Sequence, residues 1–313
     1  MQKKLTDLRI IFMGTPEFAV ASLQALVEYG CTIVAVVTAP DKQAGRGLQL
    51  QQSAVKQYAI SQHITVLQPF KLKDETFIQA LQTLQADIQI VVAFRMLPVI
   101  VWSMPPLGTI NVHGSLLPNY RGAAPIHWAV INGESQTGVT TFKLQHEIDT
   151  GNILDQQIIE IAPTDTTGIV HDKMMYVGAT LLIKTLEKVA TGTIIEIPQL
   201  QSIENKHAPK LHTETCAINW EQSSEIIYNF IRGLSPYPTA YTTLANKKFK
   251  IYFGEAEIIK HPNQAATVIT DNKTYLKFAT NNGYILCTDV QLEGKKRMQI
   301  ADFLRGYKVP ATT

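Results

Sequence analysis

Two apolar runs near the start of the chain flank a stretch with the pattern of a helix. Residues 8–13 and 31–38 are almost wholly apolar, which is typical of strands buried on both faces of a sheet. Between them, Thr15 as N-cap and Pro16 at the first helical position predict a helix that stops at Gly30. This order of elements predicts a parallel βαβ unit, and with it a doubly wound α/β fold with a mostly parallel sheet.

The same periodic patterns recur along the chain. Further strands are expected over 65–67, 88–94, 138–144 and 152–161, and helices over 53–62, 74–84, 125–132, 166–191 and 220–232. From 241 to 292, short alternating segments separated by turn residues predict a small β-barrel or sandwich, which a helix over 299–304 closes. We therefore expect a catalytic domain over 1–191, a linker over 192–210 and a C-terminal β-barrel domain over 211–313.

Composition narrows the class of protein. Hydrophobic residues make up 45% and charged residues 17% of the 313, which indicates a globular protein with a sizeable core. No apolar run approaches the ~20 residues of a membrane span, and the polar N-terminus does not look like a signal peptide. Cys31, Cys216 and Cys287 lie far apart without a CxxC motif, so neither a disulfide framework nor a zinc site is indicated. We expect a cytoplasmic protein without a membrane partner.

Charge is unevenly distributed. Residues 1–204 contain 14 Lys and Arg against 17 Asp and Glu, a balance of −3, whereas residues 205–313 contain 14 against 9, a balance of +5. A basic C-terminal part favours a polyanionic partner, although ordinary surface charge remains the alternative.

The polar residues that best fit catalysis lie around one strand. Asn111 and His113 are two residues apart, so they share one face of a strand that breaks at Gly114. Asp149 follows in an Asp-Thr-Gly turn. An amide, an imidazole and a carboxylate near strand ends can stabilise an oxyanion and move protons, although each is also common in a purely structural role. Ser115 lacks the GxSxG setting of a nucleophile, which favours direct acyl transfer over a covalent acyl-enzyme.

Two segments at strand ends are candidates for ligand contacts. Residues 39–52 form a Gly-containing loop with Lys42 and Arg46, which is either a phosphate-contacting arm or a solvated surface loop. The strand over 88–94 runs into Arg95-Met96-Leu97-Pro98, which either lines an apolar pocket or only turns the chain. GxGxxG does not follow the first strand and GxxxxGK is missing from the chain, which argues against a dinucleotide or P-loop site.

Several runs together resemble the folate-dependent formyltransferases. They are INVHGSLLPNYRGAAPIHWAVINGE, TGVTTFKLQHEIDTGNIL, the opening IIFMGTPEFA, the loop TAPDKQAGRG, the hairpin VVAFRMLP and the stretch KHAPKLHTETCAINW. The resemblance implies a Rossmann-like formyltransferase domain followed by a small OB-like β-barrel. It also implies 10-formyltetrahydrofolate as the formyl donor, the α-amine of methionyl initiator tRNA as the acceptor, and no metal. We expect the protein to be a monomer.

The resemblance also implies roles for particular residues. Asn111, His113 and Asp149 match the catalytic positions of the family. The residues expected at the folate are Phe94, Arg95, Met96, Leu97, Ser115, Leu116, Leu117 and Pro118. The residues expected at the tRNA are Lys42, Arg46, Lys206, Lys210, Lys247 and Lys248.

The chain departs from the family pattern at three places. Lys42 replaces a common Arg, Leu48-Gln49 replace a Lys pair, and Arg95-Met96 replace smaller or aliphatic residues. The alternatives are a formyltransferase of the same fold that acts on a small amine, such as a sugar nucleotide or glycinamide ribonucleotide, and a non-catalytic RNA-binding protein. A basic C-terminal part argues against the first alternative, and the intact Asn-His-Asp set argues against the second.

Overall fold

The computed structural model describes residues 3–44, 49–200 and 205–310. Its contacts divide the chain into two compact units. The first unit consists of residues 1–121, 138–159 and 171–206, and the second of residues 122–137, 160–170 and 207–313. Two segments from within the N-terminal two thirds of the chain thus group with the C-terminal part, which the order of the elements alone does not indicate.

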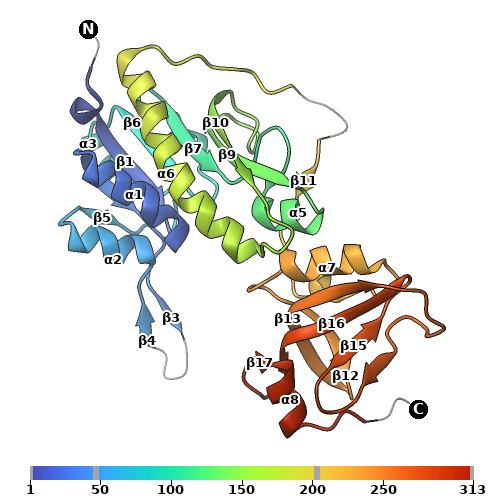
Figure 1. Cartoon of the computed structure of the whole chain (residues 1–313). Coiled ribbons are helices and arrows are strands. Elements are labelled where there is room, and N and C mark those ends of the chain that lie inside the picture. The colour runs from blue at the N-terminus through green and yellow to red at the C-terminus, as the bar shows by residue number, and fades with distance from the viewer. Residues whose placement is uncertain (1–2, 45–48, 201–204, 311–313) are drawn as a thin grey trace. The chain divides into compact units, whose positions relative to one another are not determined.

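A seven-stranded, mostly parallel sheet forms the centre of the first unit, in the order β10-β9-β7-β6-β1-β2-β5 (Figure 1). The strands are β1 (Arg9–Gly14), β2 (Thr32–Val37), β5 (Val66–Leu67), β6 (Ile88–Val92), β7 (Thr109–His113), β9 (Gln136–Lys143) and β10 (Ile153–Glu160). The pairs of β1 with β2 and β6, of β2 with β5 and of β6 with β7 are parallel, whereas β9 runs antiparallel to β7. The predicted doubly wound, Rossmann-like architecture is confirmed.

Helices cover both faces of this sheet. They are α1 (Glu17–Glu28), α2 (Ala54–Ser61), α3 (Glu75–Thr83), the short α4 (Val99–Trp102) and α6 (Thr167–Thr191), with a 3₁₀ turn at Leu5–Asp7. Phe77 of α3 and Val101 of α4 pack with Met13 and Val91 on one face. On the other face, α6 crosses the sheet (Figure 1). Gly178 of α6 lies so close to Val112 that a Cβ added at Gly178 would stand 3.3 Å from a methyl group of Val112.

The first helix begins differently from the expectation. Pro16, not Thr15, is the N-cap, and no side chain caps the helix. The reason is that Pro16 has an extended backbone, with ψ of 174°, so helical geometry starts only at Glu17. The predicted stop is confirmed, because α1 ends at Glu28 and Gly30 has a φ of +84°.

A two-stranded ribbon stands where the sequence indicated a loop without regular structure. Strands β3 (Lys42–Ala44) and β4 (Gln49–Gln51) pair antiparallel, with Lys42 opposite Gln51. Each strand is only three residues long and mostly polar, so the sequence pattern does not predict it. Next to it, Asp41 forms a half-buried 2.6 Å ion pair with Lys56 of α2.

An antiparallel half-barrel forms most of the second unit, in the order β12-β13-β16-β15-β14, with β17 on β16. These strands are β12 (Ala240–Leu244), β13 (Lys247–Ile258), β14 (Val268–Thr270), β15 (Leu276–Ala279), β16 (Gly283–Leu292) and β17 (Met298–Gln299). The remaining elements are α5 (Pro125–Ile131), α7 (Ser224–Gly233), α8 (Ile300–Gly306), the 3₁₀ turn Glu214–Cys216 and the short strand β11 (His207–Ala208). The short strand β8 (Arg121–Gly122) contains the last residue of the first unit and the first residue of the second. The predicted small β-domain is confirmed.

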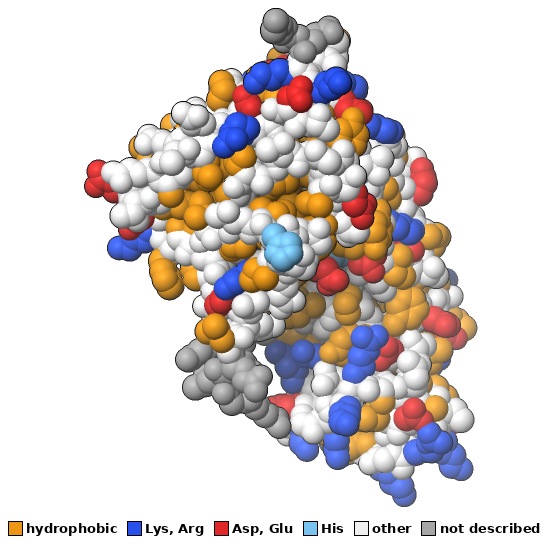
Figure 2. All heavy atoms as spheres, turned by 90° about the vertical axis from the view of Figure 1, so that its left-hand side faces the viewer, with side chains coloured by type: hydrophobic (Ala, Val, Ile, Leu, Met, Phe, Trp, Pro, Cys, Tyr) orange, Lys and Arg blue, Asp and Glu red, His pale blue; other side chains and the backbone are white. Residues whose placement is uncertain are grey.

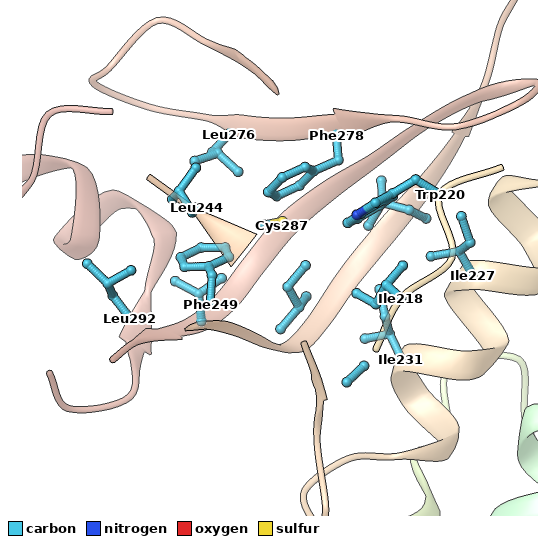
Figure 3. Close-up of a cluster of buried hydrophobic side chains, with 14 of the residues drawn as sticks. Ile218, Trp220, Ile227, Ile231, Leu244, Phe249, Leu276, Phe278, Cys287 and Leu292 are labelled. Carbon is cyan, nitrogen blue, oxygen red and sulfur yellow. The ribbon is translucent and has the colours of Figure 1, made fainter. Parts of the chain in front are cut away.

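One apolar cluster holds this unit together (Figure 3). Trp220 stacks on Phe278 with ring centroids 4.6 Å apart, and Ile227 and Ile231 of α7 close the cluster from the side of the helix. The two rings and Phe249 are almost completely buried, so the half-barrel has a core of its own.

Candidate active site

Strand β7 presents two polar side chains on one face of the sheet. In the register of the sheet, Asn111 lies opposite Val91 of β6 and Phe142 of β9, and His113 lies opposite Thr140 of β9. Because Val112 faces α6, its neighbours Asn111 and His113 face the opposite side. The expected common face is therefore confirmed. Among the described residues, the Asn111 side chain has no hydrogen-bond partner, so its carboxamide is available to a ligand.

His113 is held by a backbone carbonyl. Its side chain is 7% exposed, and Nε2 lies 2.9 Å from the carbonyl oxygen of Tyr120. A carbonyl oxygen can only accept a hydrogen bond, so Nε2 must donate and carry a proton. The other ring nitrogen, Nδ1, faces Asp149. Tyr120 is a functional residue that the sequence does not reveal, because its contribution is a backbone atom.

Asp149 approaches His113 from a tight turn. Its Oδ2 lies 3.9 Å from His113 Nδ1, which is longer than a hydrogen bond but within the range of an ion pair once the imidazole is protonated. The turn brings Gly151 so close to the end of β9 that a Cβ there would stand 1.7 Å from the carbonyl oxygen of Lys143. Asp149 itself has a φ of +55°, in the left-handed region that L-residues rarely adopt. The structure thus brings together three side chains that the sequence separates by up to 38 positions.

The segment from Ser115 to Pro118 is fixed by a buried network. Thr140 Oγ1 donates to the carbonyl oxygen of Ser115 at 2.7 Å and accepts from the backbone N–H of Leu117 at 3.1 Å. Gln156 Nε2 donates to both Thr140 Oγ1 and the carbonyl oxygen of Leu117. The Ser115 hydroxyl donates to the carbonyl oxygen of Asn119. Ser115 and Leu117 are therefore engaged by the protein, while Leu116 and Pro118 are partly exposed.

In the segment from Phe94 to Leu97, too, some side chains are held by the protein and others are exposed. Leu97 packs into the core below the sheet, and Phe94 is half-buried against the same cluster. Arg95 donates to the carbonyl oxygens of Pro69 and Phe70, and partial burial lowers the pKa of its guanidinium. Met96 is 76% exposed. Met96, an exposed apolar side chain just after the end of β6, is therefore the residue of this segment that is most accessible to a ligand.

The cationic residues singled out in the sequence lie in both units. Lys42 and Lys206 belong to the first unit, where both side chains are exposed, and the Lys206 ammonium lies 6.0 Å from the centre of the Tyr120 ring. Arg46 lies outside the described residues. In the second unit Lys210 and Lys247 are exposed, and the Lys248 ammonium lies 3.8 Å from the centre of the Tyr241 ring. Many side chains on the visible part of this unit are Lys or Arg (Figure 2).

Among the described residues, no group of three or more His, Cys, Asp or Glu side chains has the arrangement of a metal site. Cys31, Cys216 and Cys287 are free thiols, and burial raises the pKa of Cys31 to about 11. Within 3–44, 49–200 and 205–310, none of the helices combines the length and apolar character needed to cross a bilayer.

Known proteins resemble this chain over nearly its whole length. A methionyl-tRNA formyltransferase of Phocaeicola vulgatus is 54% identical, over 98% of this chain and 98% of that protein. One of Bacteroides fragilis is 51% identical, over 97% of this chain and 96% of that protein. Among solved structures, WlaRD, a sugar 3N-formyl transferase determined with dTDP and 5-N-formyl-THF, superimposes with a TM-score of 0.66 at 19% identity. That match covers 92% of this chain and 99% of WlaRD, and supports the fold.

Two family descriptions account for most of the sequence. The family described as Formyl transferase matches residues 8–186, which include β7 and the Asp149 turn. The family described as Formyl transferase, C-terminal domain, matches residues 210–308. Together with relatives above 50% identity, these matches establish that the chain belongs to the formyl transferase family.

Proposed function

We propose that the protein transfers the formyl group of 10-formyltetrahydrofolate to the α-amine of methionyl initiator tRNA, giving formylmethionyl-tRNA for translation initiation. The relatives that cover almost the whole chain at 50–54% identity are named methionyl-tRNA formyltransferase. The observation that carries the proposal is the meeting of Asn111, His113 and Asp149 at the end of β7 in a chain of this family.

The geometry supports a direct transfer. The neutral amine forms a bond to the formyl carbon, the bond from that carbon to N10 of the folate breaks, and the amine proton passes to N10. Asn111 donates a hydrogen bond to the formyl oxygen as negative charge develops there. Because His113 Nε2 is committed to Tyr120, the imidazole is proposed to act on this charge through Nδ1, the nitrogen that also lies 3.9 Å from Asp149. A donor of this kind contributes roughly 3–4 kcal/mol to lowering a barrier.

Asp149 has two tasks in this scheme. At 3.9 Å from His113 Nδ1, its carboxylate is proposed to orient the imidazole ring. It also accepts the proton that the attacking amine releases and passes it, directly or through water, to the departing nitrogen. The scheme requires neither a metal nor a covalent intermediate on the protein.

Two segments are proposed to bind the folate. Met96 and Phe94 after β6, with Leu116 and Pro118 after β7, offer apolar surface at the same edge of the sheet. Arg95, Leu97, Ser115 and Leu117 are proposed to act through the backbone shape that their contacts maintain. Tetrahydrofolate is bound in the HypX structure of Aquifex aeolicus, which has the same fold with a TM-score of 0.64.

The tRNA is proposed to contact basic residues of both units. Lys42 on the β3–β4 ribbon, together with Arg46, is the proposed contact for the acceptor end. Lys206, Lys210, Lys247 and Lys248 are the proposed contacts for phosphates, whose charge such side chains neutralise. Tyr241, covered by Lys248, adds an aromatic surface beside a cation. We expect a cytoplasmic monomer.

One assay tests the proposal. The protein is incubated with 10-formyltetrahydrofolate and either methionyl initiator tRNA, unacylated initiator tRNA or an amino-sugar nucleotide. Formation of formylmethionyl-tRNA alone, with Asn111→Ala as the inactive control, supports the function. Formylation of the amino-sugar nucleotide instead indicates the alternative of a small-amine formyltransferase.

A further inference from the structure

The turn that carries Asp149 is clamped from outside by a glutamine of the segment that follows α6. Gln199 Nε2 donates to the carbonyl oxygen of Asp149 at 2.9 Å and to that of Gly151 at 2.7 Å. On the other side of the same amide, Oε1 accepts from Arg121 Nε at 3.0 Å and from Arg121 Nη2 at 2.6 Å. We propose that Gln199 is a positioning residue, which holds Asp149 in register with His113 during formyl transfer.

The orientation of the Gln199 amide follows from its partners. Two carbonyl oxygens can only accept hydrogen bonds, and a guanidinium group can only donate them. The NH₂ group must therefore face the turn and the oxygen must face Arg121. In this orientation both donors and both lone pairs of the amide are used. A side chain with all four of its hydrogen bonds made is restrained in direction as well as in position.

The turn needs such a restraint. Asp149 has a φ of +55°. This conformation is unfavourable in free energy for a residue with a side chain, and it persists only where surrounding contacts impose it. The carboxylate must also stay 3.9 Å from a ring that Tyr120 holds from its other side. Gln199 bonds the carbonyl groups on both sides of Thr150, so it fixes the turn without touching the carboxylate itself.

The backbone before Gln199 is docked independently. Ile197 and Ile153 of β10 exchange two backbone hydrogen bonds of 2.8 Å. Glu196 accepts from Lys143 Nζ at 3.0 Å and from Asn152 Nδ2 at 2.9 Å. The sequence pattern of this segment is that of a linker, yet its contacts place Gln199 against the turn. Removal of the amide therefore leaves the segment attached, which allows the role of the amide to be tested alone.

The inference rests on the proposed function, because it requires Asp149 to act in formyl transfer. The test measures formylation of methionyl initiator tRNA by the full chain carrying Gln199→Met, which keeps the length of the side chain but removes its hydrogen bonds. Gln199→Glu keeps an acceptor for Arg121 but sets oxygens against the two carbonyls. Glu196→Ala, which removes two hydrogen bonds from the same segment without touching the Asp149 and Gly151 carbonyls, is the matched control.

We expect both Gln199 variants to lower kcat by about 10- to 100-fold, since a displacement of about 1 Å costs about 100-fold in rate. The KM values for both substrates should stay within about twofold, the melting temperature should match that of Glu196→Ala, and Glu196→Ala should retain kcat. In an Asp149→Ala background, Gln199→Met should add no further loss, because residues that act as one unit are not additive.

Two results overturn the inference. One is a kcat within twofold of wild type for Gln199→Met. The other is a loss that multiplies with that of Asp149→Ala, which shows that the amide acts independently of the carboxylate. If instead the wild-type protein forms no formylmethionyl-tRNA, the proposed function fails, whatever the variants do.

Discussion

Replacement of Gly151 by alanine tests whether the position of the Asp149 turn controls catalysis. A Cβ at residue 151 would stand 1.7 Å from the carbonyl oxygen of Lys143 and 3.3 Å from the Phe142 ring. Real Cβ contacts are no shorter than 3.0 Å, so the turn and the end of β9 must separate by 3.0 − 1.7 = 1.3 Å. The backbone of Gly151 does not have a positive φ, so these contacts, and not backbone strain, oppose the alanine.

The size of this displacement sets the expected loss. Asp149 is two residues away in the same turn. Because its carboxylate already lies 3.9 Å from His113, a further displacement would break the interaction between the two side chains. A shift of about 1 Å in a reacting group costs about 100-fold in rate, so we expect kcat for formylation to fall by about that factor. Overpacking at such a site costs about 1–3 kcal/mol of unfolding free energy, which leaves the protein folded.

The assay is a single-turnover measurement with saturating folate donor and methionyl initiator tRNA. Urea unfolding of the same samples separates a displaced turn from a loss of folded protein. Gly306→Ala is the control, because a Cβ there meets nothing within 4 Å and its φ is not positive. A Gly151→Ala variant with kcat within twofold of wild type would refute the reasoning, since the turn would then move without consequence for the chemistry.

Four further predictions concern chemistry, pH dependence, the second unit and tRNA binding. Asn111→Ala should lower kcat by about 100- to 1,000-fold with unchanged tRNA affinity in filter-binding assays, because it removes one donor to the oxyanion. The hydrogen bond from Lys56 lowers the pKa of Asp41 below its unfolded value. The resulting stability is present above the unfolded pKa of about 4 and is lost as pH falls through the folded pKa. Asp41→Asn should therefore remove part of the acid dependence in pH-dependent unfolding. Phe278→Ala should cost about 3–5 kcal/mol in urea unfolding, because this ring is 1% exposed and stacks on Trp220. Lys247→Ala should reduce the slope of log affinity for tRNA against log salt by about 1; an unchanged slope would exclude a phosphate contact there.

Local patterns determined the elements and the faces they present. Alternation along residues 109–113 set Asn111 and His113 on one side, and the structure confirms this because the period of a strand depends only on the strand itself. Local patterns also predicted the opening βαβ unit and the β-rich C-terminal part. The predictions of a helix cap at Thr15 and of a loop in place of the β3–β4 ribbon were wrong. The backbone angle ψ of Pro16 delays the start of the helix, and the pairing of β3 with β4 forms a ribbon without an apolar pattern in the sequence.

Tertiary structure alone decided which of these groups meet. Asp149 reaches His113 because Gly151 lets the turn close against Lys143. The carbonyl of Tyr120, rather than any side chain that the sequence displays, determines which nitrogen of His113 faces Asp149. Gln199 lies in a stretch with the pattern of a linker, yet it bonds the turn 50 residues earlier in the chain. Sequence periodicity carries no information on such contacts, because they depend on the register and packing of segments that are distant along the chain.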